Sequence, residues 1–130
     1  MKGLDTIVIP VAGLGTRLRP ATYATTKEML RLVDKPILYY LLAEAYKAGI
    51  HKVIFIAHKE RDDLKKFIKG KNIKDAVLND FPDMKLQVLE TNKRWGDGQC
   101  LYEARDILKK EKAFAVTMGD LISLPGESLI

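Results

Sequence analysis

The sequence predicts an α/β fold in which a mainly parallel sheet carries helices on both faces. Two observations support this prediction. Short apolar runs rich in β-branched residues alternate with longer segments whose apolar residues recur at helical spacing. The chain has 130 residues, enough for one domain with its own hydrophobic core. No internal repeat or linker-like stretch divides the sequence, so residues 1–130 are treated as one domain.

Four strands and three helices are expected in order along the chain. The strands cover residues 6–11, 52–57, 85–89 and 113–118, and the first two contain continuous apolar runs, as expected for strands buried on both faces of a sheet. The helices are amphipathic and cover residues 36–48, 60–69 and 98–110. Gly49 ends the first helix and Gly70 ends the second. Residues 71–84 are ambiguous, with one helical turn expected over 75–78.

This alternation, with right-handed crossovers, predicts a Rossmann-like three-layer α/β/α sandwich. Ligands of such sheets bind outside the carboxyl ends of the strands. The loops after Val11, Ala57, Leu89 and Met118 should therefore surround one site. The fourth strand is apolar and is expected to be central, yet few residues follow it. We therefore expect either a chain truncated after this strand or a homo-oligomer whose second copy covers the edge.

Composition excludes several classes of function. The net charge of +5 suits anionic phosphate substrates. The basic segments lack interleaved aromatic residues and any nucleic-acid-binding motif, so no nucleic-acid partner is expected. The one cysteine, Cys100, excludes an intrachain disulfide and fits the cytoplasm, where we expect the protein. No apolar run approaches the roughly 18 residues needed to span a bilayer, and no signal peptide is recognisable, so no membrane partner is expected.

The first strand leads into the glycine-rich stretch VAGLGTRLRPAT, residues 11–22. Two well-known phosphate loops do not match it. A Walker A loop requires Ser or Thr after Gly-Lys, and the only Gly-Lys pair is followed by Asn72. A dinucleotide-binding loop requires a third glycine, where Leu18 stands, and an acidic residue after the second strand. An NAD site is therefore not expected.

The glycine-rich stretch still offers groups that bind anions. Gly13 and Gly15 allow backbone N–H groups to turn inward around an anion. Arg17 adds a guanidinium, whose charge-assisted hydrogen bonds suit phosphate, and Lys27 adds a point charge. The stretch thus predicts a polyphosphate site, with a tight turn carrying solvated arginines as the alternative.

Further motifs extend this pattern along the chain. They are Lys27-Glu28-Met29-Leu30, Leu32-Val33-Asp34-Lys35-Pro36, Ala48-Gly49-Ile50, Gly96-Asp97-Gly98 and Met118-Gly119-Asp120. In this order, after the glycine loop, they resemble the sugar-1-phosphate nucleotidyltransferases, most closely the bacterial UTP–glucose-1-phosphate uridylyltransferases. The resemblance covers the whole chain but only the N-terminal half of such an enzyme, and it implies the nucleotidyltransferase type of the Rossmann-like fold.

The resemblance implies nucleotidyl transfer from a nucleoside triphosphate, UTP above all, to a sugar-1-phosphate, glucose-1-phosphate above all. The products would be a nucleotide sugar and pyrophosphate. The attacking phosphate oxygen is already an anion, so no general base is needed. Catalysis would then rest on positioning and charge stabilisation.

Site residues follow from the same resemblance. The loop expected to hold base and triphosphate consists of Ala12, Gly13, Leu14, Gly15 and Thr16. Arg17 would neutralise the departing pyrophosphate, and Lys27 would bridge the α-phosphate and the sugar phosphate, so both are candidate catalytic residues. Asp120 would bind a Mg²⁺ cofactor. Gly96 would form a turn over the base, and Glu28 would either contact the base or face solvent.

The sequence departs from the family pattern at several positions. Thr26 and Arg31 stand where the family has prolines, and Thr91 stands where it has the glutamine that reads uracil. The base and the sugar therefore stay open. These departures favour an alternative function, a non-catalytic nucleotide-sensing or regulatory subunit of the same fold. A third hypothesis is a half-domain that associates with a partner over its fourth strand.

Overall fold

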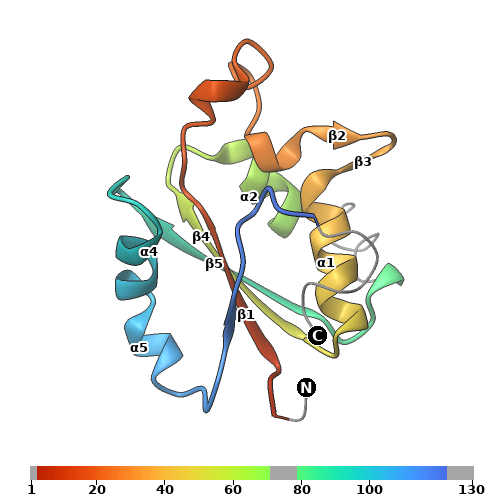
Figure 1. Cartoon of the computed structure of the whole chain (residues 1–130), viewed down its shortest axis with the longest axis vertical. Coiled ribbons are helices and arrows are strands. Elements are labelled where there is room, and N and C mark those ends of the chain that lie inside the picture. Colours follow the sequence, from red (N-terminus) through yellow and green to blue (C-terminus); the bar gives the residue numbers. More distant parts are fainter. Residues whose placement is uncertain (1–2, 71–78, 123–130) are drawn as a thin grey trace.

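The computed structural model describes residues 3–70 and 79–122; the helical turn expected over 75–78 lies outside these residues (Figure 1). Its main sheet has four parallel strands in the order β5-β4-β1-β6. These strands are β1 (Thr6–Val11), β4 (Lys52–His58), β5 (Lys85–Thr91) and β6 (Ala115–Val116). The α-helices are α1 (Ile37–Lys47), α2 (Asp62–Lys69), α4 (Asp97–Glu103) and α5 (Arg105–Leu108). A short antiparallel hairpin, β2 (Arg31–Leu32) and β3 (Lys35–Pro36), precedes α1.

Helices cover both faces of the sheet, as Figure 1 shows with α1 and α2 on one side and α4 and α5 on the other. Successive side chains of a strand point to opposite faces. Ile7 and Ile9 of β1 therefore pack in the core cluster that contains the α1 and α2 side chains. Val8 packs with side chains of α4 and α5 in a second cluster. The predicted three-layer α/β/α sandwich is confirmed.

Strand β1 is the centre of the structure. It pairs with β4 along its whole length, from Thr6↔Lys52 to Val11↔Ala57, and with β6 on its other side. All six of its residues are buried, which agrees with the continuous apolar run in the sequence. After β1 the chain continues to β4 and β5 on one side and then returns to β6 on the other. Such a switch in direction opens a crevice at the carboxyl ends of the two strands, the usual ligand position in α/β sheets.

Two elements differ from the sequence prediction. The helix expected over 98–110 is divided at Ala104, whose ψ of −3° departs from helical geometry, into α4 and α5. The fourth strand comprises two residues instead of six, and within residues 3–70 and 79–122 it is an edge strand, not a central one. Three apolar side chains around it are between 37% and 42% exposed, namely Phe114, Val116 and Met118. Of the helices described, none is long and apolar enough to cross a membrane.

Candidate functional site

The glycine loop leaves the carboxyl end of β1. Gly15 has a φ of 64°, a left-handed conformation that L side chains rarely adopt. A Cβ atom at Gly15 would also lie 3.2 Å from Cγ2 of Thr22. The Thr22 hydroxyl donates a hydrogen bond of 2.7 Å to the Gly15 carbonyl and so closes the loop. Arg17 follows in an exposed 3₁₀ turn, Thr16–Leu18.

The N-terminus of α2 holds the glycine loop and the segment before Lys27. Arg61 donates from Nη2 to the Gly13 carbonyl. The Asp63 carboxylate accepts hydrogen bonds from the Thr25 hydroxyl at 3.0 Å and from the Thr26 N–H at 2.5 Å, and it also accepts one from the Thr26 hydroxyl. Burial raises the pKa of Asp63, but these hydrogen bonds outweigh it, so the pKa lies below its usual value.

The structure brings Lys27 and Asp120 together from positions 93 residues apart. Lys27 begins a 3₁₀ turn, Lys27–Met29, and its Nζ lies 2.8 Å from Oδ2 of Asp120. Asp120 follows β6, while the Lys27 side chain lies beside Gly13 of the loop that follows β1. The two predicted charges thus meet at the switch point between β1 and β6.

Gly119 allows the segment that carries Asp120 to approach Lys27 and the end of β1. A Cβ atom at this position would lie 2.7 Å from Cγ of Glu28 and 2.8 Å from Cγ1 of Val11. Real Cβ atoms do not approach other carbon atoms so closely. The segment after β6 can therefore pack against the end of β1 only because residue 119 lacks a side chain.

Glu28 is a buried acid within this cluster. Its side chain is 1% exposed, so the solvent-facing alternative considered from the sequence is wrong. Oε1 lies 3.7 Å from Lys27 Nζ, whereas Oε2 is buried and has no hydrogen-bond partner within the described residues. Burial is the main cause that raises the pKa of Glu28, and the negative charge of Asp120 adds to it, while Lys27 lowers it.

A cleft of about 160 Å³ lies between the glycine loop and the start of α4. It is lined by Ala12, Gly13, Leu14, Arg94, Gly96, Asp97 and Cys100. Gly96 therefore lies on the same cleft as the glycine loop. Of the predicted residues, Gly15, Thr16 and Arg17 lie further along the loop and outside the cleft lining, and Lys27, Glu28 and Asp120 form the adjoining charged cluster.

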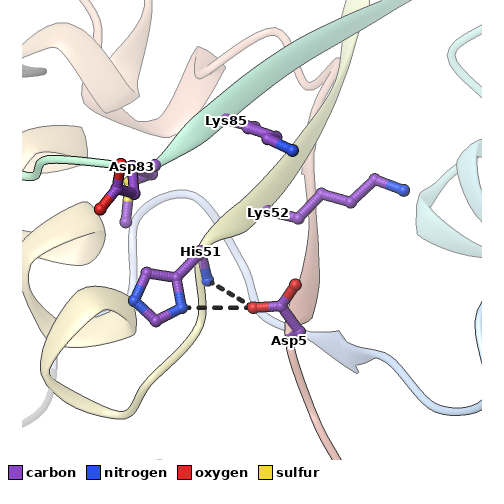
Figure 2. A pocket seen from close by; sticks show the side chains of 6 residues that line it. Asp5, His51, Lys52, Asp83 and Lys85 are labelled. Carbon is purple, nitrogen blue, oxygen red and sulfur yellow. Dashed lines mark hydrogen bonds and ion pairs between the residues drawn. The ribbon is translucent and has the colours of Figure 1, made fainter.

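A larger hollow of about 660 Å³ lies at the opposite end of the sheet (Figure 2). It is lined by Asp5, His51, Lys52, Asp83, Met84 and Lys85. Figure 2 shows His51 turned toward Asp5, with its Nδ1 3.3 Å from the Asp5 carboxylate. This hollow is at the amino ends of β1, β4 and β5 and contains none of the predicted site residues. The smaller cleft is the better candidate because ligands of such sheets bind at the carboxyl ends.

The sequence analysis did not identify the roles of four residues in this region. Arg61 and Asp63 hold the glycine loop and the segment before Lys27, Arg94 lines the cleft, and Gly119 allows close packing against Glu28 and Val11. Arg61 and Asp63 follow the end of β4. The rule that strand carboxyl ends line the site would have pointed to this polar segment.

We expect Gly119→Ala to destabilise the protein by about 1–3 kcal/mol, because the new methyl group overlaps Glu28 and Val11. Chemical denaturation measures this loss. Gly98→Ala is the matched control, since its Cβ would meet nothing within 4 Å and the residue lies in α4. It should leave stability unchanged or raise it by up to about 1 kcal/mol. Equal effects of the two substitutions would refute the role given to Gly119.

We expect Asp63→Ala to cost about 2–3 kcal/mol at pH 7, because the buried Thr26 N–H and hydroxyl lose their acceptor. The folded pKa of Asp63 lies below the ordinary value of an aspartate, so this stabilisation is present above that ordinary value and is lost as the pH falls through the folded pKa. Denaturation curves at several pH values should show the deficit shrinking in acid. Asp62→Ala, one residue earlier and exposed, is the control and should change stability by less than about 0.5 kcal/mol. A pH-independent deficit would contradict the assignment.

Comparisons with known proteins identify the family of this chain. The family model for nucleotidyl transferases matches residues 6–126. A UTP–glucose-1-phosphate uridylyltransferase of Haemophilus ducreyi is 34% identical over an aligned length of 131, and the match covers 89% of this chain and 44% of that protein. The Escherichia coli protein of the same name is 51% identical over 57 residues, which is 44% of this chain and 19% of that protein.

Solved structures show the same relationship. A UDP-glucose pyrophosphorylase from Acinetobacter baumannii matches with a TM-score of 0.81 and 25% identity, over 95% of this chain and 48% of that one. A UDP-glucose pyrophosphorylase complexed with UDP-glucose matches with a TM-score of 0.73 and 25% identity, over 90% of this chain and 46% of that one. The chain thus spans about half the length of the relatives it matches. From the extent of the family match and the shared fold, the chain belongs to the nucleotidyl transferase family.

Proposed function

We propose that this protein transfers a nucleotidyl group from a nucleoside triphosphate to a sugar-1-phosphate. The observation that carries the proposal is the contact of Lys27 with Asp120 at the switch point, beside the glycine loop. A cation and a carboxylate at this place suit a phosphate and a metal ion bound side by side. We propose UTP and glucose-1-phosphate as substrates, supported by the names of the related proteins.

In the proposed reaction an oxygen of the sugar phosphate attacks the α-phosphorus. The bond from the α-phosphorus to the bridging oxygen breaks, and pyrophosphate leaves with the electron pair. The Lys27 ammonium would contact both the α-phosphate and the incoming sugar phosphate and so reduce the repulsion between two anions. Arg17 would hold the β- and γ-phosphates, where negative charge accumulates as the bond breaks. Backbone N–H groups of the glycine loop would bind the triphosphate.

Magnesium is the proposed cofactor, and the residues present fit it. Mg²⁺ prefers oxygen ligands and is usually held by one or two carboxylates together with substrate phosphates. Asp120 supplies an accessible carboxylate, and Glu28 supplies a buried carboxylate oxygen with no partner in the described part of the chain. When bound there, the ion would neutralise phosphate oxygens of both substrates. Asp120 and Glu28 are therefore the side chains that would hold it.

The test is release of pyrophosphate by the full-length natural protein from each of UTP, CTP, dTTP, ATP and GTP with glucose-1-phosphate and Mg²⁺. Lys27→Met should lower kcat on the order of 10²- to 10³-fold, because a preorganised cation at the reacting phosphate is lost. Asp120→Asn should lower kcat by a similar factor and raise the Mg²⁺ concentration required. Lys110→Met and Asp106→Asn are matched controls at exposed positions in or just after α5, outside the cleft lining and the charged cluster, and should retain normal rates.

Each outcome separates the hypotheses. No turnover with any nucleotide would contradict the proposed reaction. Nucleotide binding without turnover would support the alternative, a nucleotide-sensing or regulatory subunit, which the departures at Thr26, Arg31 and Thr91 favour. Turnover that survives both Lys27→Met and Asp120→Asn would refute the roles assigned to these residues.

A further inference from the structure

We propose that Arg94 determines which base the protein binds. It would select bases with an oxo group, such as uracil with O4 or hypoxanthine with O6, over cytosine and adenine, which carry an amino group at the same ring positions. The inference rests on the proposed function, because it assumes that the cleft between the glycine loop and α4 receives the base. It assigns to this chain a base-reading residue at a position other than 91.

Arg94 contributes the one cationic side chain to the cleft lining that the structure describes. Its guanidinium is anchored from one side. Nη2 donates to Oε2 of Glu60 at 2.8 Å and lies 3.2 Å from Nδ1 of His58. His58 ends β4 and is 4% exposed, so this anchor is attached to the sheet itself. A planar fork held at one end presents its remaining N–H groups in a fixed direction.

His58 and Glu60, which hold the Arg94 guanidinium, are also hydrogen-bonded to each other. The Glu60 backbone N–H also lies 3.3 Å from His58 Nδ1 and donates to it. The Glu60 N–H and the Arg94 guanidinium are thus both directed at His58 Nδ1. Arg94 lowers the pKa of Glu60, so this carboxylate stays ionised and keeps its ion pair at neutral pH.

Thr91, by contrast, is buried and hydrogen-bonded to the backbone. Its side chain is 3% exposed, and its hydroxyl oxygen accepts the backbone N–H of Lys93 at 3.0 Å. It does not belong to the cleft lining. The position where the family pattern has a base-reading glutamine therefore has a structural role here, and Arg94, three residues later, is the cationic residue of the cleft lining.

The chemistry of arginine fixes which bases it accepts. A guanidinium donates hydrogen bonds and accepts none. Uracil O4 and the O6 of guanine or hypoxanthine are acceptors, whereas cytosine N4 and adenine N6 are donors. A donor opposite a donor leaves both groups without a partner, and this mismatch lowers the affinity for the amino-bearing base. Arg94 should therefore favour UTP over CTP and inosine triphosphate over ATP.

The experiment compares these two matched pairs of nucleotides. Calorimetry would measure the affinities of UTP, CTP, ITP and ATP, each with Mg²⁺, for the full-length protein. We expect the oxo member of each pair to bind about 10- to 100-fold more tightly than the amino member. Arg94→Ala should abolish this ratio mainly by weakening the oxo nucleotide, and Arg94→Lys should restore part of it. Lys93→Ala removes the same charge one residue earlier, outside the cleft lining, and should preserve the ratio.

The result separates the inference from the proposed function. Equal affinities within both pairs for the native protein, or an unchanged ratio in Arg94→Ala, would overturn the role of Arg94 and leave the proposed function standing. A uniform loss of affinity for all four nucleotides in Arg94→Ala would also overturn it, because that result indicates attraction to the phosphates alone. Failure of the native protein to bind any nucleotide would overturn the proposed function and this inference with it.

Discussion

The carboxylate of Asp63 determines where the site can form. The long segment between β1 and α1 contains only 3₁₀ turns and a hairpin of two short strands, β2 and β3. Such a segment buries few apolar groups of its own and needs tertiary contacts to hold one conformation. Asp63 supplies them by accepting the N–H and hydroxyl of Thr26, directly before Lys27. Because α2 is packed on the sheet through Leu64, Phe67 and Ile68, the position of Lys27 is fixed relative to β1.

The charged groups at the switch point are unequal in number. Lys27 contacts both Asp120 and Glu28, so the cluster contains one cation and two carboxylates. A triphosphate with a divalent cation offers each of these groups a partner of the opposite charge: phosphate oxygens for Lys27 and the cation for the carboxylates. Ligand binding would thus exchange partners within a preformed arrangement, with little reorganisation of the backbone. Such preorganisation is the main source of electrostatic catalysis in phosphoryl transfer.

Much of this structure was predictable, for reasons that differ between elements. The uninterrupted apolar run of β1 predicts a strand buried on both faces, and the structure places β1 at the centre of the sheet. The break of the last helix at Ala104 was not predictable, because the apolar spacing continues through it. The anchoring role of Asp63 was hidden because an acidic residue in the first turn of a helix normally indicates only a favourable dipole. Burial of Glu28 depends on Gly119, more than 90 positions away, and local patterns carry no such information.

The most direct test of the account is a crystal structure of the protein with a non-hydrolysable UTP analogue and Mg²⁺. We expect the base in the cleft between Ala12–Leu14 and Gly96, the triphosphate along Gly13–Arg17, and the α-phosphate within hydrogen-bond distance of Lys27 Nζ. A nucleotide bound instead in the hollow beside Asp5 and His51, at the amino ends of the strands, would contradict it.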